Sequence, residues 1–190
     1  MIRPLLFLLV LGAPLAALGQ EQTYIVDPNH SQPVFEVQHL MGYSNQHGSF
    51  GKVSGKVTLD RTAKKGSVEF TIDTTSIRTL TEKLETHMKG EDFFNVAKYP
   101  TMTFKSTNVI FDGDRVVGVD GELTMIGVTR PVSLKVVNFV CGEHPFNKKP
   151  MCGAEATTTI KRSEWGMKYG VPKAVGDDVR LTLPVEAYRE

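Results

Sequence analysis

The sequence predicts an all-β protein in which antiparallel strands form a sandwich or a closed barrel, with one short helical insertion at about residues 79–95. Three observations lead to this fold class. Apolar and polar residues alternate with a period of two in many successive runs, so each run has one buried and one wet face. Turn signals separate these runs at intervals. In one segment the alternation stops, and the apolar residues recur with helical spacing instead.

The N-terminal segment has the pattern of a secretion signal. Arg3 precedes an uncharged apolar run from Leu5 to Leu11, and Ala17 and Gly19 place small residues three and one positions before a cut. We therefore expect cleavage before Gln20, which removes residues 1–19 and leaves residues 20–190 as a single domain. A bilayer-spanning helix needs about 20 apolar residues. The run is shorter than that, so we expect an exported, soluble protein without a transmembrane anchor.

The strand runs define an inward apolar face. The clearest alternations supply Phe35, Val37, Phe70, Ile72, Met102, Phe104, Leu123, Met125 and Ile160. Val117 and Val119 share the parity of Leu123 and are expected to face inward with it. Further alternating runs lie at residues 53–59, 132–136 and 179–185. Asp112-Gly113-Asp114 is typical of a hairpin turn between two of the strands.

The helical segment has apolar residues four positions apart, at Leu80, Leu84 and Met88. Thr79 or Thr81 is a candidate N-cap, and Gly90 is expected to end the helix. The adjacent aromatics Phe93 and Phe94 follow on a second short turn. Two interpretations are open for them: a lid with at least one ring pointing into a barrel, or a plug that only closes its end.

The charge balance excludes some partners. The chain has 22 Lys and Arg residues against 21 Asp and Glu residues, and no long basic run. Removal of Arg3 with the signal would make the mature chain neutral. Nucleic acid and anionic membrane surfaces are therefore poor candidate partners.

The two cysteines, Cys141 and Cys152, favour a disulfide, because an even pair in an exported protein is usually oxidised. A free thiol or a metal pair is the alternative, but the spacing is not that of a CxxC motif. The disulfide would close a short loop and contribute at most about 3 kcal/mol.

The inward residues alone do not distinguish a solid core from a cavity. Small barrels pack their interiors with side chains, whereas barrels of about eight strands can hold one small ligand. A long apolar ligand would gain about 25 cal/mol per Å² of buried apolar surface, so it would need few polar contacts.

The polar candidates at the edge of this apolar face are His30, His39, Asp27 and Arg162. Either histidine is a candidate to hydrogen-bond a lipid head group, and Asp27 is placed to orient His30. A structural Asp–His hydrogen bond in the loop explains the same residues.

Arg162 has inward parity, and a buried arginine must be paired. Its partner is either a ligand or an acidic group, or Arg162 is a clasp that stacks on an aromatic ring. The five histidines lack HxH or HExxH spacing, so we expect no metal. No GxSxG elbow or phosphate-binding Gly loop occurs, and we expect no catalytic residues.

The chain resembles the YceI-like family across residues 24–185. The resemblance rests on the order and spacing of short motifs: Asp27, His30-Ser31, Phe35, Val37, His39, Phe50-Gly51, Phe93-Phe94, Tyr99-Pro100, Phe104-Lys105-Ser106, Gly121-Glu122-Leu123, Gly127-Val128-Thr129, Pro131-Val132 and Arg162-Ser163. It implies an eight-stranded, lipocalin-like antiparallel barrel whose long apolar pocket binds a polyisoprenoid or similar amphiphile. It also implies a periplasmic location and is compatible with a homodimer.

Together these features predict a periplasmic carrier, not an enzyme, with a bound isoprenoid lipid or quinone as ligand and no other cofactor. The expected ligand-binding residues are the inward set with Leu84, Met88, Phe93, Phe94, Arg162, His39, His30 and Asp27. The alternative is an enzyme that acts on such a lipid and uses His30 with Asp27 as an acid/base pair.

Overall fold

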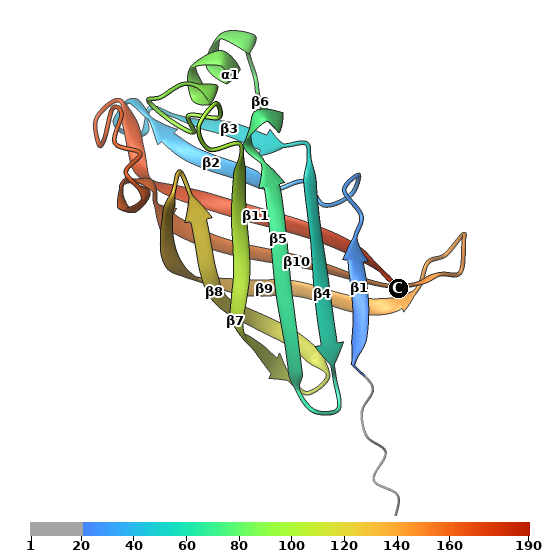
Figure 1. Ribbon diagram of the computed structural model, residues 1–190. Coiled ribbons are helices and arrows are strands. Elements are labelled where there is room, and N and C mark those ends of the chain that lie inside the picture. The colour runs from blue at the N-terminus through green and yellow to red at the C-terminus, as the bar shows by residue number, and fades with distance from the viewer. Residues whose placement is uncertain (1–20) are drawn as a thin grey trace, which may run out of the picture.

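A computed structural model describes residues 21–190, and Figure 1 shows how they are arranged. The predicted signal peptide lies outside the described residues. Antiparallel strands form one barrel, hydrogen-bonded in this order: β1 (Gln22–Val26), β4 (Val53–Asp60), β5 (Lys65–Asp73), β7 (Thr101–Asp112), β8 (Arg115–Met125), β9 (Val128–Glu143), β10 (Pro150–Lys161) and β11 (Val175–Arg189). Pairing of β1 with β11 closes the ring. The predicted eight-stranded antiparallel barrel is therefore confirmed, and a sandwich is excluded.

Three further strands extend the sheet past β11: β2 (Val34–His39), β3 (Ser44–Phe50) and β6 (Ile77–Thr79). The long strand β11 has two partners along one edge. Its first part pairs with β2, from Val175 opposite His39 to Thr182 opposite Val34, and its last residues pair with β1. Helix α1 (Glu82–Lys89) follows β6 and lies over the end of the barrel at which β3 and β6 pair (Figure 1). The 3-10 turns η1 (Leu40–Gly42), η2 (Thr74–Ser76) and η3 (Arg162–Trp165) complete the structure.

Helix α1 is shorter than the predicted helical segment. Thr81 is the N-cap, and its hydroxyl accepts a hydrogen bond from the Leu84 N–H at 3.3 Å. Gly90 ends the helix, as predicted. Residues before Thr81 pair with β3 instead, and residues after Gly90 fold into tight turns. Leu80, expected on the apolar face of the helix, is 78% exposed, because it precedes the N-cap.

The alternation along β8 changes phase once. The register between β7 and β8 shifts where Ile110 pairs with Gly118 and Phe111 pairs with Val116. Such a bulge places one extra residue in the strand. Val116 and Val119 are therefore the buried residues, and the inward orientation predicted for Val117 is wrong. The predicted hairpin turn at residues 112–114 is confirmed, with Gly113 and Asp114 joining β7 to β8.

Candidate functional site

The barrel encloses an apolar cavity of about 210 Å³. On a comparable measure one water molecule needs roughly 15 Å³, so this space is much larger than a packing defect. Its wall consists of alternate residues from the barrel strands together with residues of β2 and of the segment around α1. Among the described residues that line it, Arg162 has the sole charged or polar side chain. Such a wall suits a hydrocarbon chain and offers little to hold water.

Most of the residues predicted from sequence line this cavity. They are Phe35, Val37, Phe70, Ile72, Met88, Phe93, Phe94, Met102, Phe104, Leu123, Met125, Ile160 and Arg162. The fold therefore brings together side chains from distant parts of the chain on one continuous surface. Their contact with a ligand stays a prediction.

Other lining residues were not among those predicted to bind a ligand. They include Phe50, Val57, Leu59, Val68, Val109, Val116, Val119, Val132, Leu134, Val136, Phe139, Val179, Leu181, Leu183 and Val185. Most lie on strands whose alternation was recognised, so parity alone could have found them. Ala154 and Ala156 of β10 give a weaker signal, because alanine is common on both faces of a strand.

Phe93 and Phe94 close the α1 end of the cavity. Both are buried and both line it. The Phe94 ring meets Phe50 edge to face, with centroids 5.4 Å apart. The Phe93 ring lies against His87 at 5.0 Å and Tyr169 at 5.4 Å. The two rings thus act as a lid, and open space remains beneath them.

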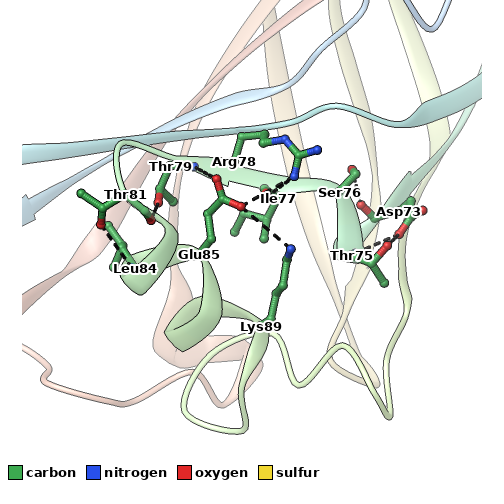
Figure 2. Close-up of polar contacts among 10 residues, drawn as sticks. All are labelled: Asp73, Thr75, Ser76, Ile77, Arg78, Thr79, Thr81, Leu84, Glu85 and Lys89. Carbon is green, nitrogen blue, oxygen red and sulfur yellow. Dashed lines mark hydrogen bonds and ion pairs between the residues drawn. The ribbon is translucent and has the colours of Figure 1, made fainter.

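A network centred on Glu85 ties α1 to β6 (Figure 2). One carboxylate oxygen of Glu85 accepts from the Thr79 N–H at 3.3 Å, and the other lies 3.6 Å from the Arg78 guanidinium. Lys89, one turn further along the helix, lies 3.9 Å from the same oxygen. The helix that precedes the lid residues is therefore anchored to β6 by its polar face.

Arg162 is 3% exposed, and its donors are directed to backbone carbonyls. Nε donates to Gly176 at 2.8 Å, Nη1 to Met167 at 3.1 Å, and Nη2 to both Tyr169 at 2.8 Å and Val175 at 3.0 Å. Burial lowers the pKa of the guanidinium below its ordinary value. The group also lies 5.9 Å from the Phe93 ring centroid. Arg162 is thus the clasp that the sequence suggested, holding residues 167–176 against the lid.

Asp27, His30, His39 and Leu84 lie outside the cavity wall. His30 Nδ1 is 2.7 Å from Asp27 Oδ2, and the His30 side chain is 62% exposed. The hydrogen bond that His30 donates to Asp27 raises the pKa of His30, and the same bond lowers the pKa of Asp27. Glu186 lies 3.9 Å from His30 and completes a small surface cluster. The hydrogen bond between Asp27 and His30 lies at the surface, and it matches the structural Asp–His bond that the sequence also suggested.

His39 pairs with Val175 at the end of β2, and Leu84 of α1 is partly buried and packs against the hydrophobic core. Neither His30 nor His39 lines the cavity wall.

The predicted disulfide is confirmed. Cys141 and Cys152 are directly paired residues of β9 and β10, and their sulfurs are bonded. The bond lies toward the turn that joins the two strands, beyond the cavity-lining pair Phe139 and Ala154. It pins the hairpin without contributing to the wall of the cavity. In the part of the chain that the structure describes, no helix is long and apolar enough to span a membrane.

A closed antiparallel barrel around an apolar cavity, with a helical lid at one end, defines a lipocalin-like barrel. The model of the YceI-like domain matches residues 24–187, and the chain belongs to this family. It is 34% identical to a UPF0312 protein of Pseudomonas aeruginosa, with all of both chains covered. It is 36% identical to the protein YceI of Escherichia coli O157:H7, over 85% of this chain and 83% of the relative.

Solved structures share the same fold. The crystal structure of Burkholderia cenocepacia BcnA superposes with a TM-score of 0.73 at 23% identity and covers 85% of this chain and 98% of that one. A polyisoprenoid binding domain from Saccharophagus degradans, implicated in plant cell wall breakdown, superposes with a TM-score of 0.66 at 16% identity. That comparison covers 88% of this chain and 98% of the neighbour.

Proposed function

We propose that the barrel binds and carries one long-chain isoprenoid lipid or a similar amphiphile, such as a quinone or its precursor, in the periplasm. The cavity wall is the observation that carries this proposal, because it is apolar apart from Arg162 and four of the five N–H groups of Arg162 are taken by carbonyls. An apolar tail gains about 25 cal/mol per Å² of surface that it buries there. The polyisoprenoid binding domain with the same fold and the predicted signal peptide support the ligand class and the compartment.

The head group of this ligand lies outside the wall. Within the described chain the cavity wall offers little to this head group, since four of the five N–H groups of its one guanidinium are committed to carbonyls of residues 167–176. Selectivity then comes from the length and shape of the tail. The enzymatic alternative lacks comparable support, because His30 and Asp27 are on a surface loop away from the cavity.

The proposal is tested by filling the cavity. Ala156→Phe adds a ring on the inner face of β10, and Glu155→Phe adds the same ring on the exposed face of the same strand. We expect Ala156→Phe to weaken binding of a long polyprenol at least tenfold, while Glu155→Phe binds as the wild type does. Circular dichroism checks that both variants are folded. If Ala156→Phe is folded and binds normally, or if the wild type neither binds polyprenol nor yields any lipid on solvent extraction, the proposal is wrong.

A further inference from the structure

Two loops that are far apart in sequence form an exposed apolar tip at the lid end of the barrel. The first is the β2–β3 turn, in which Leu40 is 50% exposed, Met41 is 73% exposed and Tyr43 is 86% exposed. The second is the loop at residues 168–173, which follows η3. They are joined by hydrogen bonds from the Leu40 N–H to the Ala174 carbonyl at 2.9 Å and from the Met41 N–H to the Lys173 carbonyl at 3.0 Å. Figure 1 shows both at the end of the barrel that carries α1.

The backbone holds these apolar side chains out in water. Leu40 and Met41 have φ of 47° and 56°, in the left-handed region that bulky residues rarely adopt. The two hydrogen bonds to residues 173 and 174 hold this conformation in place. The turn therefore keeps a strained backbone while Met41 and Tyr43 stay exposed to solvent. Adjacent exposed apolar side chains of this kind mark interaction surfaces.

The charge of the tip suits an anionic surface. Lys168 and Lys173 are exposed on the second loop, and neither residues 39–44 nor residues 166–174 include an acidic residue. The two acidic residues that follow are engaged elsewhere: Asp177 with Ser163, and Asp178 with Lys161 at 2.8 Å. Helix α1, nearby, has charges of both signs. Methionine, tyrosine and lysine side chains around a protruding turn are the chemistry that enters the interface of an anionic bilayer.

The tip is also connected to the cavity. Tyr169 of the second loop contacts the Phe93 ring, and Phe93 lines the cavity. Arg162 bonds the carbonyls of Met167 and Val175, which flank the loop and line the cavity as well. One layer of side chains therefore separates the tip from the interior.

We propose that this tip, formed by residues 40–43 and 168–173, docks on the surface of an anionic phospholipid bilayer and that the ligand passes between membrane and barrel at this end. The inference rests on the proposed lipid-carrier function and names the surface from which the lipid comes. The near-neutral composition of the chain predicts that an anionic membrane is a poor partner, because it argues against a broad basic face. Docking through the tip requires no such face, because Lys168 and Lys173 lie in the tip itself.

The test is flotation of the purified protein with vesicles of phosphatidylethanolamine and phosphatidylglycerol, compared with vesicles of phosphatidylcholine alone. We expect binding to the anionic vesicles and a loss of roughly tenfold or more in Met41→Ser/Tyr43→Ser, because two inserted side chains are removed. Lys168→Gln/Lys173→Gln should lose about an order of magnitude on anionic vesicles. The matched control is Phe146→Ser. Phe146 is 89% exposed on the β9–β10 turn beside Lys148 and Lys149, but it does not line the cavity, and this variant should bind as the wild type does.

A second measurement separates this inference from the carrier function. Binding of a short, water-soluble prenyl probe without vesicles should be unchanged in Met41→Ser/Tyr43→Ser. The docking inference alone is wrong if the wild type binds the probe normally but does not bind the vesicles. It is also wrong if Met41→Ser/Tyr43→Ser binds the vesicles as well as the wild type does. Absence of probe binding in the wild type overturns the carrier function as well. If sedimentation shows a wild-type dimer that Met41→Ser/Tyr43→Ser abolishes, the tip is an interface between copies of this chain and the inference is also wrong.

Discussion

The hydroxyl of Ser31 forms two hydrogen bonds to the backbone of Glu186, donating to its carbonyl at 3.1 Å and accepting from its N–H at 2.9 Å. This contact lies where β11 changes partner, between Thr182, its last pairing with β2, and Ala187, its first pairing with β1. Residues 183–186 have no strand beside them on that edge. Ser31, which is fully buried, therefore supplies the hydrogen bonds of a missing strand residue and completes the closure of the barrel.

Ser31→Ala should destabilise the protein by about 1–3 kcal/mol, because the buried N–H of Glu186 loses its acceptor. The carbonyl keeps its bond from the Asp27 N–H at 2.8 Å, so the loss is confined to one group. The midpoint of thermal unfolding should fall by about 2–4 °C per kcal/mol. Ser44→Ala, at an exposed position in β3, should leave the midpoint unchanged. Equal midpoints for the two variants would show that the Ser31 bonds do not stabilise the closure.

Arg162→Lys should destabilise the protein strongly, by about 3 kcal/mol or more, although it keeps the charge. A lysine ammonium lacks the planar fork that reaches four carbonyls, and buried acceptors left unpaired cost about 1–3 kcal/mol each. Urea unfolding measures the loss, and hydrogen exchange should show faster opening of residues 167–176. Lys161→Ala removes the neighbouring exposed pair with Asp178 and should change little. Unchanged exchange in Arg162→Lys would contradict the clasp.

The residues of the cavity wall could largely be predicted from the sequence, because parity along a strand is a local property. Phe70, Phe104 and Ile160 needed only their alternation with polar neighbours to be placed inside. Parity failed at Val117, where a bulge that depends on the pairing with β7 shifts the phase. The choice between Thr79 and Thr81 as N-cap needed the fold for a similar reason, since Thr79 pairs with Gly48 of β3 and the helix begins after Thr81.

The polar contacts could not be predicted, because their partners are distant or lie in the backbone. Ser31 and Glu186 are 155 positions apart, and nothing in either residue type specifies the bond. Arg162 was recognised as a buried cation in need of partners, yet those partners are carbonyls, which every residue has. The pairing of Asp27 with His30 was accessible because it is local. The exposed tip required the fold to bring Met41 beside Lys173.

The Asp27–His30 pair should give the free energy of unfolding a defined pH dependence. The hydrogen bond to Asp27 raises the pKa of His30 above 6.5, so its contribution is fully present below pH 6.5 and is lost as the pH rises through the raised pKa. The hydrogen bond from His30 lowers the pKa of Asp27 below 3.8, so its contribution is present above pH 3.8 and is lost as the pH falls through the lowered pKa. The pair therefore stabilises the fold most between about pH 4 and pH 6.5.

This dependence is measured by urea unfolding of the wild type, His30→Gln, Asp27→Asn and the double variant across pH 4 to pH 9. The interaction free energy from the double-mutant cycle should be largest near pH 5 to 6 and should shrink toward pH 9. An interaction that grows with rising pH would show that the neutral imidazole, not the imidazolium, is the bonded form.

Replacing both cysteines, as Cys141→Ala/Cys152→Ala, should lower the free energy of unfolding by at most about 3 kcal/mol and leave the barrel closed. The two positions are 11 residues apart, so the loop that the bond closes removes little entropy from the unfolded chain. The ladder between β9 and β10 continues on both sides of the bond, to Glu143 opposite Pro150 and to Phe139 opposite Ala154. Because that ladder already fixes the register of the hairpin, ligand binding should be unchanged. Loss of the β-sheet circular dichroism signal in this variant would instead mean that the hairpin cannot form without its disulfide.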